Sequence, residues 1–249
     1  MKGWVVPVGL LLFAEISARV FGITSDSLAS PSQILAAAWR FLSTGALFAR
    51  SAQTLLAALS GLLIGGGLGL TLAILLGLIP PLSRLLRFPI EALRPIPSIA
   101  SLPIVLMIYG FGYRMEIAIT AFACFWPVLI IGQSAIVGIE PRLIEVSRVL
   151  GLSFFSRVTK LALPAALPRL FVAFRQAAAV SLVVAVTVEI VMNPQGLGYE
   201  LMTAQNSLQP ALMFAILIYI GLLGWSLNAV LLLAQKHLFA FAAVPKLNA

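Results

Sequence analysis

Long apolar segments set the strongest limit on what this chain can fold into. Six of them cover residues 4–22, 53–79, 97–112, 116–137, 168–192 and 211–234. A helix of about 20 apolar residues crosses a bilayer core roughly 30 Å thick. Charged residues make up only 10% of the chain, against roughly 25% in a soluble domain. The sequence therefore predicts an all-α membrane protein of about six transmembrane helices. We expect one domain over residues 1–249, with its core at about 45–240.

The distribution of positive charge predicts the orientation of these helices. The chain has 16 Lys and Arg residues against 8 Asp and Glu. If the N-terminus is cytoplasmic, only Arg19, Arg40, Arg50 and Arg114 lie on the outer side and the other twelve basic residues lie on the inner side. Cytoplasmic loops of membrane proteins are enriched in Lys and Arg. We therefore expect a multi-pass protein of the cell (inner) membrane with both termini in the cytoplasm, and no binding to nucleic acid.

The segments between the spans carry weaker signals. Residues 30–44 predict a capped amphipathic helix at the outer interface, and Glu15 and Arg19 stand at i, i+4, where they can pair. We read residues 84–94 as a loop and residues 193–198 as a turn. Prolines at 95, 97 and 103 are expected to break the start of the third span, and broken helix starts in membranes line a cavity or pack within protein.

The second apolar segment repeats small residues at every fourth position. These residues are Gly61, Gly65, Gly69, Ala73 and Gly77. Such a ridge lets another helix approach closely. The neighbouring helix could belong to the same subunit or to a second copy, and the spacing leaves both open.

A polar, basic stretch, EVSRVLGLSFFSRVTKLALP, occupies residues 145–164 between the fourth and fifth apolar segments. Leu143, Val146 and Leu150 share one helical face, with Glu145 and Arg148 toward the other. Residue 151 is a glycine where a helix C-cap needs positive φ, and the serine at 153 can cap a second helix that ends at Leu-Pro 163–164. We expect two short amphipathic helices at the membrane surface, with the polar face outward, suited to binding another protein.

This stretch resembles the EAA loop of the membrane subunits of ATP-binding-cassette (ABC) importers. Glu145, Gly151, Leu161, Leu163 and Pro164 stand at the family's spacing, whereas the residues at 146 and 147 replace two alanines of the pattern. The segments SPSQ at 30–33, RPIPSIA at 94–100, FG at 111–112 and GLG at 196–198 resemble the nitrate, sulfonate and taurine branch of these permeases. The resemblance extends over roughly residues 28–240.

The resemblance implies a type I ABC importer permease fold with a cytoplasmic coupling-helix loop over about residues 138–166. It also implies a homodimer, cytoplasmic ABC ATPase subunits and an extracytoplasmic substrate-binding protein. The chain would form the pathway for a small organic or inorganic anion such as a sulfonate, taurine or nitrate, although relatives also serve heterocyclic vitamin precursors. Residues expected to couple to the ATPase are Glu145, Ser147, Arg148, Gly151, Phe154, Phe155, Leu161, Leu163 and Pro164.

Nothing in the sequence predicts catalysis by this chain. It has no Gly-x-x-x-x-Gly-Lys-Ser/Thr motif, so a P-loop cannot hold nucleotide phosphates, and ATP hydrolysis is expected on a separate subunit. His237 is the only histidine and Cys124 the only cysteine. We therefore expect no metal site, no cofactor and no intramolecular disulfide.

Glu189 is a carboxylate deep in the late apolar run SLVVAVTVEIVMN. An ionisable side chain within a span is a functional candidate, because burying it unpaired costs at least a few kcal/mol. It also lies four residues before Asn-Pro 193–194, so it could reach the outer headgroups instead. We leave open a gate or pathway role and a role as an interfacial anchor. Further gate or pathway candidates are Thr187, Gln176, Pro97 and Ser98.

Two other functional classes compete with the importer. An ion-coupled secondary transporter acting without an ATPase would need intramembrane carboxylates or histidines for coupling, and Glu189 with Glu15 is a small supply. A membrane scaffold that transports nothing would explain the apolar spans. It would leave the amphipathic stretch at 145–164 and the broken third span unexplained.

Overall fold

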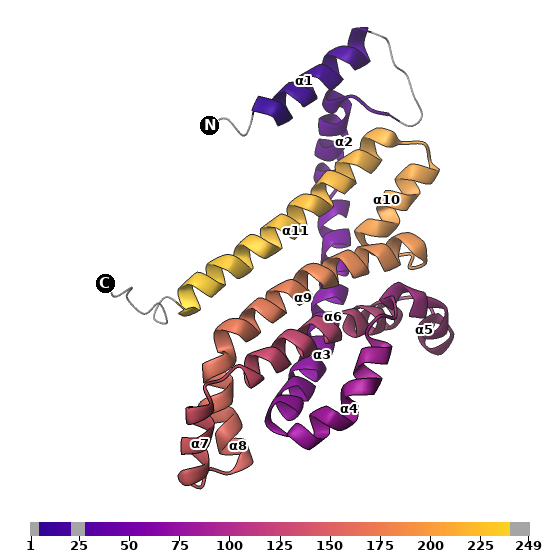
Figure 1. Cartoon of the computed structure of the whole chain (residues 1–249). Coiled ribbons are helices and arrows are strands. Elements are labelled where there is room, and N and C mark those ends of the chain that lie inside the picture. The colour runs from indigo at the N-terminus through magenta and orange to yellow at the C-terminus, as the bar shows by residue number, and fades with distance from the viewer. Residues whose placement is uncertain (1–4, 21–27, 240–249) are drawn as a thin grey trace, which may run out of the picture. The chain divides into compact units, whose positions relative to one another are not determined.

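The computed structural model describes residues 5–20 and 28–239, and this part of the chain is helical with no strand (Figure 1). The predicted all-α class is confirmed. The chain divides into two compact units. Unit 1 comprises Met1–Leu56 and Val186–Trp225, and unit 2 comprises Ala57–Ala185 and Ser226–Ala249. Each unit is described by itself below.

Four described helices are long and apolar enough to cross a membrane. They are α3 (Ala46–Leu78), α6 (Tyr113–Val137), a continuous helix over Phe154–Val191, and α11 (Pro210–Phe239). A fifth span is counted if α4 (Pro80–Leu93) and the helical segment Ser98–Tyr109, which meet at an 82° bend, form one broken span. The expected break near the prolines is therefore present. The expected first span corresponds to α1 (Val5–Val20), with 16 residues; its predicted end residues 4, 21 and 22 lie outside the described part.

The ridge of small residues in unit 2 packs against α6 of the same chain. A Cβ at Gly61 would lie 2.6 Å from Thr120 Cβ, and one at Gly69 would lie 2.6 Å from the carbonyl oxygen of Phe125. A Cβ at Gly65 would overlap the backbone of residue 121. Small residues therefore let the α3 and α6 backbones approach as closely as membrane helices do at such motifs. The ridge serves packing within the subunit.

Residues 84–93 lie in helix α4 and Arg94 caps its end, so the expected loop over 84–94 was wrong. Pro80 and Pro81 occupy the first helical turn, where a missing N–H costs nothing. Leu82, Leu86 and Ile90 recur every four residues and pack against a cluster of buried side chains on α3 and α6. The arginines and Glu91 lie on the other side, with Arg87 Nε 2.9 Å from Glu91 Oε1. The charges that suggested a loop belong to the exposed face of an amphipathic helix.

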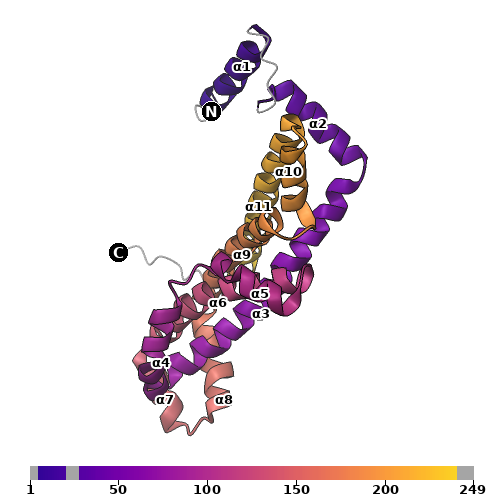
Figure 2. The same cartoon turned by 90° about the vertical axis from the view of Figure 1, so that its right-hand side faces the viewer.

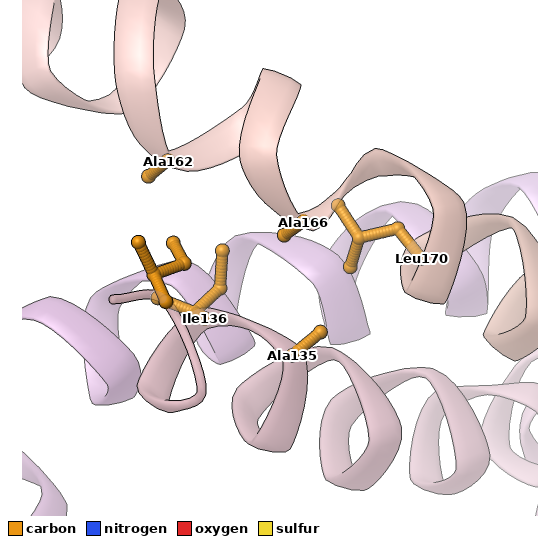
Figure 3. Close-up of a cluster of buried hydrophobic side chains, with 6 residues drawn as sticks. Ala135, Ile136, Ala162, Ala166 and Leu170 are labelled. Carbon is orange, nitrogen blue, oxygen red and sulfur yellow. The ribbon is translucent and has the colours of Figure 1, made fainter. Parts of the chain in front are cut away.

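A second apolar cluster in unit 2 joins the end of α6 to the start of α9 (Leu163–Val191). Figure 3 shows side chains from α9 and its preceding turn facing side chains from α6, with alanines on both sides. The buried members are Ala135, Ile136, Ile139, Ala162, Ala166 and Leu170. This cluster lies at both ends of the segment 140–161, so it fixes the base from which that segment projects.

In unit 1, helix α2 (Pro31–Ser43) begins with the capping box that the sequence predicted. The Ser30 hydroxyl accepts a hydrogen bond from the backbone N–H of Gln33, and the Gln33 side chain accepts one from the backbone N–H of residue 30. The expected pair also forms, with Arg19 Nε 2.7 Å from Glu15 Oε1. The other Glu15 oxygen accepts a hydrogen bond from Ser32 N–H at 3.0 Å. The start of α2 is thus tied to α1.

Candidate functional site: the coupling loop and the Glu189 cluster

The stretch expected to be a coupling loop is a hairpin of two helices in unit 2. Helix α7 (Pro141–Val149) and the short helix α8 (Phe154–Arg157) lie side by side in both views (Figures 1 and 2). Gly151 has φ +64°, a conformation that costs a residue with a Cβ about 1–2 kcal/mol. Leu152 N–H donates to the Ser147 carbonyl at 3.0 Å, and the Ser153 hydroxyl accepts from Ser156 N–H at 3.3 Å. The predicted glycine cap and serine cap are both confirmed.

Large apolar side chains of this hairpin are exposed together with Glu145, so apolar as well as polar groups face outward. Phe155 is 75% exposed and Val149 88%. The buried position on α7 is Ser147, whose hydroxyl donates to the Ile144 carbonyl at 2.6 Å. A small serine with a satisfied hydroxyl can face the protein at little cost, which turns the larger apolar residues outward. The other exposed apolar residues are Leu143, Val146, Leu150 and Phe154.

Among the remaining coupling candidates, Glu145 and Gly151 are exposed and Pro164 is exposed at the start of α9. Leu161 and Leu163 are half-buried against the cluster in Figure 3. Arg148 belongs to α7, but its side chain lies outside what the structure describes. The hairpin therefore presents an apolar surface with an acidic side chain beside it, on a base that is packed into the unit.

Helix α8 continues into α9 without a break, contrary to the expected end at Leu-Pro 163–164. Residues Val158–Ala162 form a π-helical turn, and Leu163 N–H donates to the carbonyl of Val158. Pro164 cannot donate a backbone hydrogen bond. A wider turn just before a proline accommodates that missing bond without ending the helix. The whole helix from Phe154 to Val191 has 38 residues.

Glu189 belongs to unit 1 and is buried, with 1% of its surface exposed. Its Oε2 accepts a hydrogen bond from Gly198 N–H at 2.8 Å, and its Oε1 accepts one from the Thr54 hydroxyl at 2.7 Å. The Thr54 hydroxyl in turn accepts one from Leu197 N–H at 3.0 Å. The carboxylate thus joins the end of α9 to α3 and to the chain at 197–198.

Residues 196–198 form the first turn of helix α10 (Gly196–Asn206), so the predicted turn ends three residues earlier than expected. Gly196 N–H donates to Gln53 Oε1 at 3.0 Å. Arg50 also donates to that oxygen, at 3.2 Å, and pairs with Glu200 at 2.7 Å. Side chains from α3 and α9 therefore accept the hydrogen bonds that the first amides of α10 cannot make within the helix.

Of the other gate or pathway candidates, Thr187 lies two residues before Glu189 on α9, and the remaining three belong to unit 2. Gln176 and Pro97 are exposed, whereas Ser98 and Thr187 are half-buried. Ser98 begins the 3₁₀ turn η2 (Ser98–Ser101), and its carbonyl accepts a hydrogen bond from the Ser101 hydroxyl at 2.6 Å.

Sequence reasoning missed three polar residues that the structure buries or places in contact. Gln53 and Thr54 at the start of the second apolar segment bond the α10 amides, and their polarity within an apolar run was the available signal. Glu116 is 1% exposed in the first turn of α6. In the described part of the chain, no group of three His, Cys, Asp or Glu side chains could hold a metal ion.

Comparison with known proteins identifies the family. Residues 65–241 match the model of the binding-protein-dependent transport system inner membrane component. The chain belongs to this family. The permease is 27% identical over 96% of its length to a Bacillus subtilis (strain 168) protein named as an aliphatic sulfonates transport permease, of which it covers 86%.

Two further relatives carry the names of different solutes. The permease is 29% identical to the riboflavin transport system permease protein of Chloroflexus aurantiacus, with 94% of this chain and 87% of the relative covered. It is 30% identical to the nitrate import permease protein of Leptolyngbya laminosa, with 74% and 66% covered. These relatives are named as permeases, not as enzymes. The chain is therefore a transport component of the membrane.

The fold agrees with a solved transporter. A chain of the MetNI methionine ABC transporter in an inward-facing conformation superposes with a TM-score of 0.63 at 20% identity, covering 84% of the permease and 99% of that chain. This likeness confirms the type I permease fold. The multi-pass arrangement in the inner membrane follows from the family and from the apolar helices.

Proposed function

We propose that this permease is the transmembrane subunit of an ATP-driven importer and that the α7–α8 hairpin docks onto a separate cytoplasmic ABC ATPase. The observation that carries this proposal is the exposed apolar surface of the hairpin. Phe155 and Val149 are more than 70% exposed at its tip. An exposed apolar surface on a small projecting element is typical of a protein-binding site, and Glu145 beside it can add polar contacts.

The proposed mechanism uses the hairpin as a lever. The helix that starts at Phe154 runs unbroken to Val191, a length of about 57 Å at 1.5 Å per residue. Gly151 sets the angle between α7 and α8, and the cluster in Figure 3 holds the base of the hairpin. Closure of two ATPase subunits on ATP would displace the hairpin and carry the start of α9 with it. The spans would then change between inward-open and outward-open states.

We propose a topology with both termini in the cytoplasm, one permease domain per chain and two chains in the transporter. The distribution of Lys and Arg supports this orientation, because twelve of the 16 basic residues then lie on the inner side. That orientation also places the hairpin in the cytoplasm, where an ATPase is located. An extracytoplasmic binding protein would deliver the solute from the opposite side.

The proposed solute is a small anion of the sulfonate, taurine or nitrate type. Its support is the family branch together with the names of the sulfonate and nitrate relatives. The riboflavin relative favours a second candidate class, a heterocyclic vitamin or its precursor. The pathway residues we propose are Gln176, Thr187, Pro97 and Ser98. Ligand retention by the cognate binding protein, tested with taurine, nitrate and riboflavin, would decide between the two classes.

The docking proposal is tested by replacing Phe155 with alanine. This side chain is 75% exposed, so its removal should leave the stability of the isolated permease nearly unchanged. We expect loss of co-purification with the partner ATPase, because buried aromatic anchors carry a large share of interface energy, up to several kcal/mol. Phe88→Ala is the matched control, since Phe88 on α4 is 79% exposed. Equal ATPase binding by both variants would contradict the proposal.

The ion-coupled transporter makes a different prediction. The purified permease would take up solute into vesicles in response to a proton or sodium gradient alone. We expect no such uptake, and uptake only after the ATPase, binding protein and ATP are supplied. Gradient-driven uptake by the permease alone would favour the rival class.

A further inference from the structure

The Glu189 carboxylate occupies a site that backbone amides form for an anion. The first amides of a helix are positively polarised and lack partners within the helix. In most anion sites built this way, a phosphate or sulfate ligand fills the position. Here the Glu189 side chain, from seven residues before α10, accepts Gly198 N–H directly and reaches Leu197 N–H through the Thr54 hydroxyl.

The two glycines of α10 are required by this arrangement. Gly196 has φ +79°, and a Cβ there would overlap the Glu189 carboxylate, with Oε2 at 2.7 Å. A Cβ at Gly198 would lie 2.7 Å from the Cβ of Glu189. Side chains at either position would displace the carboxylate from the amides. Gly196 and Gly198 therefore leave the space that the Glu189 carboxylate needs to accept the amide hydrogen bonds.

We propose that Glu189 is a positioning residue that locks α10 to α3 and to the end of α9, so that these three segments move as one rigid block during transport. The lock has two parts on α3. Thr54 bridges the carboxylate and Leu197, and Gln53 accepts from Gly196 N–H. Because Glu189 and Thr54 are buried at 1% and 0% exposure, water does not compete for these bonds. Glu189 thus acts on the pathway through α10 and does not line it.

The lock is tested directly by hydrogen–deuterium exchange of the 196–198 amides in the purified permease. Glu189→Gln keeps the shape but replaces a carboxylate, which accepts at both oxygens, with an amide that has one accepting oxygen. We expect exchange of these amides to speed up about tenfold or more, because charge-assisted hydrogen bonds are roughly twice as strong as neutral ones. Glu91→Gln, at an exposed carboxylate on α4, is the control and should leave these amides unchanged. Unchanged exchange in Glu189→Gln would overturn the lock.

A second measurement leaves Glu189 and its hydrogen-bond partners unchanged. Spin labels on cysteines at Ala49 of α3 and Gln205 of α10, both exposed, report the distance between the two helices. We expect one narrow distance distribution that is the same in the nucleotide-free complex and in the complex trapped with ATP. A shift between the two states would overturn the rigid block, even if the exchange result agreed.

The role in transport rests on the proposed function and has its own readout. In the complete transporter, Glu189→Gln should lower uptake per ATP hydrolysed, because α10 no longer follows the block, whereas a misfolded variant would lose hydrolysis as well. Thr54→Val, which removes only the bridge, should give a smaller decrease. A changed KM for the solute with unchanged exchange and unchanged label distance would instead make Glu189 a pathway residue. If no ATPase binds the permease at all, the proposed function fails, and the exchange result for the purified permease still judges the lock.

Discussion

Replacement of Gly65 by alanine tests the closest approach between α3 and α6. A Cβ at this position would lie 2.6 Å from the carbonyl carbon of Ala121 and 2.7 Å from its Cα, whereas carbon atoms at optimal contact are about 3.5–4.0 Å apart. The obstacle is backbone, so no side-chain rotation can relieve it. The two helices must separate by about 1 Å, and overpacking of this kind costs about 1–3 kcal/mol. We expect the upper end of that range.

Gly67→Ala is the matched control on the same helix. A Cβ at Gly67 would meet nothing within 4 Å. Both variants gain the same helix propensity, up to about 1 kcal/mol for Ala over Gly, so the difference between them isolates the clash. A difference of about 3 kcal/mol corresponds to roughly 6–12 °C in Tm for a chain of this size.

Thermal unfolding of the purified permease in detergent micelles measures this difference. Cys124 is the only cysteine and is fully buried on α6, so a dye that becomes fluorescent on reacting with thiols reports unfolding without further labelling. We expect Gly65→Ala to melt well below both the wild type and Gly67→Ala. Melting temperatures of the two variants within about 2 °C of each other, less than 1 kcal/mol on the same scale, would refute close α3–α6 packing.

Three further predictions follow from local geometry. Ser30→Ala removes the N-cap of α2 and should destabilise that helix by about 1 kcal/mol, measured as faster amide exchange at Gln33; unchanged exchange there would argue against the capping box. Cys124, whose Sγ donates to the Ala177 carbonyl at 3.4 Å, should resist maleimide in the folded permease and react after denaturation; rapid native labelling would contradict its burial. Gly151→Asn should bind the partner ATPase better than Gly151→Val, because asparagine tolerates positive φ and β-branched residues do not; equal binding would show that the φ of +64° is dispensable.

The helical spans and the caps of the α7–α8 hairpin could be predicted from the sequence because each depends on local rules. Gly151 could be predicted as a cap from its position between two helical patterns. Ser153 could be predicted as a cap from its position just before the second pattern. The ridge beginning at Gly61 was recognisable from its spacing of four. The helix that packs against this ridge, α6, could not be predicted. A pattern within one helix defines a face of that helix and does not say which other helix covers it.

The errors arose where a local signal competed with tertiary packing. Charges at Arg84, Arg87 and Glu91 suggested a loop, although the leucines between them follow a helical period. Glycines at 196 and 198 suggested a turn, because their second role, leaving room for a carboxylate from an earlier helix, depends on a contact between distant residues. Ser147 is buried for a similar reason, since its small size matters only once Ile144 packs against the base of the hairpin.

The π-helical turn at Val158–Ala162 makes the connection between the hairpin and α9 sensitive to residue number. A π turn holds one residue more than the α-helix around it needs. Loss of a single residue here would replace the wide turn with a regular α-helical turn directly before Pro164. That proline has no N–H to donate, and its ring would clash with the carbonyl four residues earlier, so the helix would kink or break at this point. The hairpin would then point in a different direction, and its correct direction depends on one surplus amino acid.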